Sequence, residues 1–129
     1  MSDLDELIRE KIVPFRKRIL EALAGKHPHI FKVLNAYFSG KSNNIGMQVT
    51  ENGKVIGEYT FYLDGLDIAR VESKKLSSEI HHPFGVIKPY GIVEKSYLEK
   101  MLEDEQGFIT EPFSTAAKYM PGITVKFMR

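Results

Sequence analysis

The sequence contains no cysteine, and this absence removes several kinds of chemistry at once. Without thiols the chain has no disulfide framework, no thiolate nucleophile and no cysteine-ligated zinc. The first twenty residues begin with acidic residues and are charged throughout rather than basic and then apolar, so they are unlike a secretory leader. These two features favour a reducing, cytoplasmic location, which we expect for the protein.

An excess of charge of one sign is also missing. The chain has 18 Lys and Arg against 17 Asp and Glu, a formal net charge of +1. Because the basic residues are scattered, there is no electrostatic footprint for a phosphate backbone, and we expect no nucleic-acid partner. No apolar run approaches the ~20 residues that a bilayer-spanning helix needs, so we expect no transmembrane segment.

Recognised catalytic and metal-binding motifs are absent as well. There is no Gly-x-Ser-x-Gly elbow, and the Gly-Lys-Ser stretch at 40–42 lacks the upstream glycine and preceding strand of a phosphate loop. The four histidines form two pairs, and neither pair has a carboxylate at a recognised ligand spacing. We therefore expect no metal, no cofactor and no enzymatic activity. The pairs are His27 with His29 and His81 with His82.

The first forty residues carry a helical pattern. Apolar residues recur every three or four positions from Asp3 to Leu23, which predicts an amphipathic helix, and Pro14 inside it should kink or break that helix. A second helix should begin at Pro28 and end at Gly40, where glycine supplies a left-handed cap. Because its apolar residues cover more than one face, we expect it to pack on the sheet and the first helix, or on a partner subunit. Together these helices form an N-terminal arm, residues 1–40.

The pattern then changes to a period of two over residues 44–72, which predicts a three-stranded meander. Asn52-Gly53 is a strong signal for the first hairpin turn, and Asp64-Gly65 for the second.

The stretch between this meander and the C-terminal part is less regular. Residues 73–83 are polar and predict a longer connection or a short helix. A strand is expected over 86–93, although Pro89 cannot donate to a ladder and therefore predicts an edge position or a bulge. Two interpretations of residues 81–90, rich in proline and aromatics, stay open: a rigid, aromatic-lined pocket mouth, or a stiff crossover.

Residues 86–127 predict a strand-helix-helix-strand unit. Ser96 and Glu99 match a capping box at the start of a short helix. Thr110 is suited to cap the next helix, and the alternation over 123–127 predicts a final strand.

The order of these elements resembles the sterol carrier protein type 2 (SCP-2) family. The resemblance rests on the strand and helix of residues 86–102, on the helix of 113–119 and on the glycine and alternating strand of 121–127. It implies a layered fold that encloses an apolar tunnel between sheet and helices and binds lipids without covalent chemistry. It implies no catalytic residues.

We therefore predict a single α+β domain over residues 1–129, with a roughly five-stranded, mostly antiparallel sheet covered by helices, SCP-2-like, and an N-terminal helical arm. The expected function is non-catalytic binding or transfer of a small hydrophobic, lipid-like ligand in an apolar cavity between sheet and helices. The chain's 8 Phe, 6 Tyr and 5 Met supply large apolar side chains for such a cavity. The expected pocket residues are Phe61, Leu63, Ile68, Phe84, Ile87, Leu98, Met101, Leu102, Phe108, Phe113 and Met120.

Two alternatives remain open at this stage. The N-terminal helices could present an apolar stripe to a second copy, which would make the chain a protein-interaction or dimerisation module without a small-molecule ligand. The weaker alternative is an enzyme that uses the loop of His81 and His82 with Glu72 or Glu94.

Overall fold

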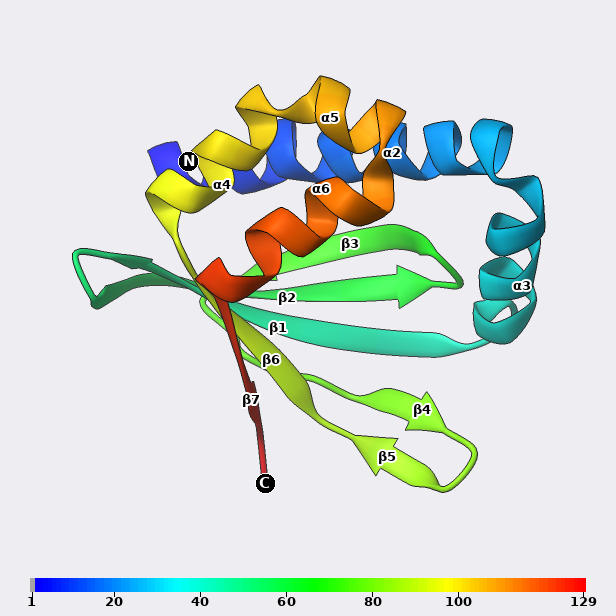
Figure 1. Cartoon of the computed structure of the whole chain (residues 1–129). Coiled ribbons are helices and arrows are strands. Elements are labelled where there is room, and N and C mark those ends of the chain that lie inside the picture. The colour runs from blue at the N-terminus through cyan, green and yellow to red at the C-terminus, as the bar shows by residue number, and fades with distance from the viewer. Residues whose placement is uncertain (1) are drawn as a thin grey trace.

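A five-stranded mixed sheet carries the fold, with helices packed on one of its faces (Figure 1). The computed structural model describes residues 2–129, apart from the side chain of His82. The strand order is β3-β2-β1-β6-β7, and a separate hairpin, β4-β5, extends away from the helices. The strands are β1 (Ser42–Glu51), β2 (Lys54–Asp64), β3 (Asp67–Ser73), β4 (Ile80–His82), β5 (Gly85–Ile87), β6 (Pro89–Glu94) and β7 (Ile123–Phe127).

The predicted α+β class and the mostly antiparallel five-stranded sheet are confirmed. One central pair departs from that pattern, because β1 and β6 run parallel. The first hairpin turn is also as predicted, since Asn52 and Gly53 adopt positive φ values of 52° and 81°. Two consecutive left-handed residues match the twist of the flanking strands, which is why Asn-Gly is favoured there.

The N-terminal segment forms one helical rod, which consists of α1 (Asp3–Glu6), η1 (Leu7–Ile12) and α2 (Val13–Lys26). Its middle part, η1, is π-helical and ends just before Pro14, which occupies the first turn of α2. We predicted a kink or a break at Pro14. The helix does not break, because a π-helical turn shifts the hydrogen-bond pattern locally and so accommodates the missing N–H of the proline. The helices are α1 (Asp3–Glu6), η1 (Leu7–Ile12), α2 (Val13–Lys26), α3 (Pro28–Phe38), α4 (Lys95–Glu103), α5 (Glu105–Thr110), α6 (Pro112–Tyr119) and the 3₁₀ turn η2 (Met120–Gly122).

Three local predictions in the C-terminal half were wrong. Pro89 is the first residue of β6, which lies between β1 and β7 rather than at the edge, and a first position is one where a strand tolerates proline. The capping box does not form: α4 begins after Glu94, whose carboxylate accepts the Gly53 N–H at 3.0 Å instead. Thr110 closes α5 by donating to the Gln106 carbonyl at 2.5 Å and does not cap α6.

The polar stretch before β4 contains no helix. It runs over the sheet face that the helices leave open, where the Thr60 hydroxyl donates to the Lys75 carbonyl at 2.8 Å and accepts the Ser77 N–H at 3.1 Å. A Cβ added at Gly46 would lie 2.7 Å from Leu76 Cδ1. The connection therefore covers part of the second face, and the β4-β5 hairpin that follows it was not predicted.

Two apolar clusters hold the helices in place: the larger joins them to the sheet, and the smaller joins helices to one another. In the larger one, Ile8 of η1 packs among strand residues such as Val49 and Val93, all nearly inaccessible to solvent. In the smaller one, Phe15 of α2 meets Phe108 edge-on, with ring centroids 5.4 Å apart, and Phe108 stacks on Tyr119 at 5.5 Å. Burial of these side chains is the main favourable term for docking the rod.

A polar contact also fixes the start of the rod. The buried Tyr59 hydroxyl on β2 donates to Asp5 Oδ1 at 2.5 Å, while Arg9 donates to the Val71 carbonyl at 2.8 Å and to Ser73 Oγ at 2.7 Å. The hydrogen bond from Tyr59 is the main cause that lowers the pKa of Asp5 from its ordinary 3.8, and burial raises the pKa of Tyr59.

The replacement Tyr59→Phe should therefore destabilise the protein by about 1 to 2 kcal/mol at neutral pH, since a partly buried hydrogen bond to a carboxylate is lost. Because the folded-state pKa of Asp5 is depressed, this contribution is present above pH ~4 and disappears as the pH falls through the folded value. Urea denaturation at pH 7 and pH 3 measures both effects. Tyr62→Phe, which removes a bond to the exposed Glu72, is the control and should cost less. An equal loss for Tyr59→Phe at both pH values would contradict the assignment.

Candidate functional site

An apolar cavity of about 330 Å³ lies between the sheet and the helices. Its walls come from the rod, from the helix-covered faces of β1, β2, β3, β6 and β7, and from α4. Of the side chains that line it, only Arg16 is charged. The lining residues are Ile12, Arg16, Ile45, Met47, Phe61, Leu63, Ile68, Gly91, Val93, Leu98, Met101 and Ile123.

The register of the sheet brings these residues together. Met47 on β1 lies opposite Gly91 on β6, and Val93 lies opposite Ile123 on β7. Residues paired in this way share one face of a sheet, so alternation places them all under the helices. Glycine contributes to the space itself, because a Cβ built at Gly91 would meet only Ile123 Cγ2, at 3.6 Å.

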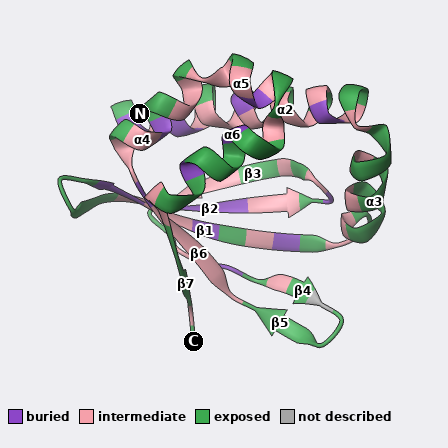
Figure 2. Ribbon diagram, in the orientation of Figure 1, coloured by how far each residue is buried: buried purple, intermediate pink, exposed green. Residues whose placement is uncertain are grey.

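The helices cover this face of the sheet less completely along β7 and the neighbouring strand β6. Val93 is 2% exposed, whereas Val125 and Phe127, on the same face of β7, are 53% and 67% exposed. Figure 2 shows β7 exposed along most of its length. The floor of the cavity therefore continues into an apolar strip that the helices do not cover.

Arg16 is the charged residue at this cavity. It is half-buried on α2, and burial lowers its pKa, while the nearby Asp67 carboxylate acts in the opposite direction. Arg16 and Ile68 also line an adjoining hollow of about 240 Å³, with Val13, Lys17 and Asp67. The two residues thus stand where the apolar cavity meets the surface between α2 and β3.

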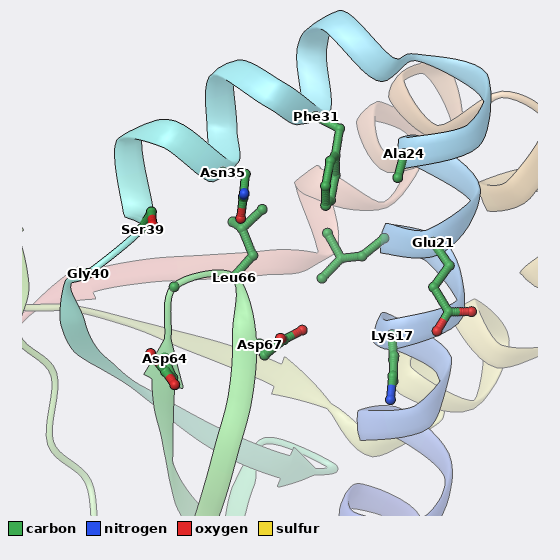
Figure 3. A pocket seen from close by; sticks show the side chains of 12 residues that line it. Lys17, Glu21, Ala24, Phe31, Asn35, Ser39, Gly40, Asp64, Leu66 and Asp67 are labelled. Atoms are coloured by element: carbon green, nitrogen blue, oxygen red, sulfur yellow. The ribbon is translucent and has the colours of Figure 1, made fainter.

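A third hollow, of about 310 Å³, continues outward from there between α2, α3 and the β2-β3 turn. Figure 3 shows Phe31 and Leu66 facing its interior, with the carboxylate of Asp67 and the ammonium of Lys17 at one end. The wall also carries Glu21 and Asp64, so its rim is polar and mixed in charge. Only the inner cavity is apolar almost throughout.

The structure brings together five of the residues that the sequence suggested for the pocket. They are Phe61, Leu63, Ile68, Leu98 and Met101. Sequence reasoning missed Ile12, Arg16, Ile45, Met47, Gly91, Val93 and Ile123. Their alternation on predicted strands placed several on a common face, but the parallel pairing that makes β1 and β6 neighbours has no local signal.

The other six expected residues do not line the cavity. Leu102 packs against both apolar clusters and Phe108 is buried in the smaller one. Phe84 lies between β4 and β5, 94% exposed, and Ile87 belongs to the same hairpin, so this stretch is not a mouth of the apolar cavity. Phe113 is exposed, and its ring centroid lies 5.6 Å from that of His27. Met120 follows α6 and is also exposed.

His27, His29 and His81 do not line the cavity, and the side chain of His82 lies outside the part of the chain that the structure describes. His81 Nδ1 and the His81 N–H both lie against Asn43 Oδ1, at 2.9 and 2.8 Å. Among the side chains that the structure describes, no three from His, Asp or Glu are placed to hold a metal ion. In the same part of the chain, no helix is both long and apolar enough to cross a membrane.

Comparison of this chain with protein-family models, with curated proteins and with solved structures finds no match. Its class is therefore defined by the fold described above, an α+β domain in which one helical layer covers part of a mixed sheet.

The space beside Gly91 gives a test of the cavity that needs no ligand. Gly91→Val should stabilise the protein by up to about 1 kcal/mol, because a β-branched residue suits a strand and its methyl groups would occupy apolar space. Gly46→Ala on the other face should destabilise it, since the added carbon would lie 3.0 Å from the Ser77 carbonyl oxygen. Thermal unfolding measures both. Destabilisation by Gly91→Val as large as that by Gly46→Ala would show that the space is already filled.

Proposed function

We propose that this protein binds or transfers a small hydrophobic, lipid-like molecule in the apolar cavity, without catalysing a reaction on it. The observation that supports the proposal most is the cavity itself, whose lining is aliphatic, aromatic or thioether apart from Arg16. The resemblance to the SCP-2 family implies the same class of ligand.

The chemistry of the lining favours an apolar molecule on energetic grounds. Removing apolar surface from water contributes roughly 25 cal/mol per Å², or about 0.8 kcal/mol per methylene group. A polar ligand group that lost its water among Met47, Phe61 and Leu98 would find no hydrogen-bond partner there, at a cost of about 1 to 3 kcal/mol.

The volume of the cavity limits which apolar molecules fit. At about 330 Å³ the cavity is near the lower end of the range for small-molecule sites, roughly 300 to 1,000 Å³. A single aliphatic chain suits this volume, and the exposed strip of Val125 and Phe127 would extend the apolar surface available to a longer one. Met47 and Met101 offer flexible side chains that adapt to different ligands.

The direct experiment has two parts. Native mass spectrometry of freshly purified protein, with an organic extract of the same sample, should detect a co-purifying apolar molecule. After its removal, the uncharged fluorophore N-phenyl-1-naphthylamine should bind and gain fluorescence in an apolar site.

Gly91→Val should weaken binding of this fluorophore by about tenfold, because the added side chain takes up cavity space at a cost of about 1.4 kcal/mol. Gly25→Ala, at an exposed helix position with open space around it, is the matched control and should bind as the original protein does. Absence of any co-purifying molecule together with no fluorophore binding would overturn the proposal.

A second candidate function is formation of a homodimer through the N-terminal helices, and α3 favours it. None of its 11 residues is buried, and Ile30, Val33 and Tyr37 form an exposed apolar stripe in which Val33 is 69% exposed. This helix therefore packs on the sheet less than we expected, and its apolar face is available for a partner.

If α3 forms such an interface, Val33→Glu should convert a dimer to a monomer, since it would place a charge at the centre of the stripe. Lys32→Glu, on the polar side of the same helix, should leave the dimer intact. Sedimentation velocity or native mass spectrometry reads the mass of each variant. A monomeric original protein at micromolar concentration would remove this candidate.

A further inference from the structure

The junction between the apolar cavity and the surface hollow is where the chain carries unbalanced positive charge. Arg16 borders both spaces, and Lys17 and Asp67 line the hollow beside it. Two cations therefore face one carboxylate at this point. Arg16 and Lys17 follow each other on α2, whereas Asp67 is the first residue of β3.

The Arg16 guanidinium has no partner among the described residues that would offset the desolvation cost of its partial burial. Within residues 2–129 it makes no hydrogen bond or ion pair, and Asp67 acts on it only at longer range. An arginine can bind a carboxylate or phosphate through two parallel N–H donors, and such bonds are strongest where water is partly excluded. Arg16 lines both the apolar cavity and the adjoining hollow, so it marks the polar end of the apolar space.

We propose that the ligand is a single-chain amphiphile with an anionic head group, carboxylate or phosphate, held by Arg16 and Lys17 where the cavity opens between α2 and β3. This proposal rests on the proposed function. The aliphatic chain occupies the cavity over Met47 and Gly91, and the head group lies beside Asp67.

The arrangement also sets where the head group stops. Farther out, the groove between α2 and α3 carries Glu21 and Asp64 in addition to Asp67, and these carboxylates repel an anion. Inward from Arg16, the lining offers no donor to an anion. The head group is therefore confined to the junction between the apolar cavity and the adjoining hollow, which Arg16 and Ile68 border.

A series of ligands with one chain length tests this selectivity on the full protein. Displacement of N-phenyl-1-naphthylamine is measured with hexadecanoate, hexadecyl phosphate, hexadecanol and hexadecyltrimethylammonium, each below its micelle concentration. The two anions should bind about tenfold more tightly than the alcohol, and the cation most weakly. Whichever anion binds more tightly identifies the head group. Inorganic phosphate alone should not displace the probe.

Three variants test whether the preference for anionic head groups depends on the junction at Arg16. Arg16→Met keeps an apolar side chain and should abolish the difference in affinity between the anions and hexadecanol. Lys11→Met removes one charge from an exposed position on the same rod and should change neither affinity. Asp67→Asn removes the competing carboxylate and should increase the preference for anions several-fold, which keeps the test decisive if Arg16→Met does not fold.

Equal binding of hexadecanoate and hexadecanol by the original protein would overturn the inference and leave the proposed function standing. The same holds if Arg16→Met retains the preference for anions. If none of the ligands, nor the probe itself, binds the original protein, the proposed function fails together with this inference.

Discussion

Packing of the N-terminal rod on one end of the sheet is the contact on which the remaining structure depends. Ile8 enters the centre of the larger apolar cluster against Val49 and Val93, and the hydrogen bond between Tyr59 and Asp5 fixes the rod beside it. Away from this contact the helices cover less of the same face, and Val125 and Phe127 are exposed there. The cavity and the exposed strip beyond it are consequences of that uneven cover.

The parallel pair of β1 and β6 is the second constraint, because it decides which side chains share the cavity. It places Gly91 beside Met47 and makes β7, through Ile123, the next strand along. A glycine in the middle of a strand is ordinarily unfavourable, since it loses conformational entropy and packs no side chain. Here its missing side chain leaves space under the helices, so the cost in stability coincides with the volume available to a ligand.

Much of the fold could be predicted from the sequence wherever the signal was local. Asn52-Gly53 specified its turn because both residues must adopt positive φ, and Gly40, at φ 74°, ended α3 for the same reason. Pro89 was placed wrongly because its tolerance depends on its position within a strand that only tertiary pairing defines. Among the residues that line the cavity, strand alternation marked Phe61 and Leu63 in the sequence. Gly91 has no side chain to signal a face, and Arg16 looked like any polar residue of an amphipathic helix.

An unfilled apolar space inside a small domain is unfavourable, because the surrounding side chains lose dispersion contacts that close packing would provide. Arg16 is half-buried and has no hydrogen-bond or ion-pair partner in the described part of the chain, which adds a desolvation cost at the border of the same space. Either feature alone could be an imperfection of packing. A chain with an anionic end would relieve both at once, its methylene groups filling the space and its head group pairing with Arg16, and this shared solution is why the two features are better explained together.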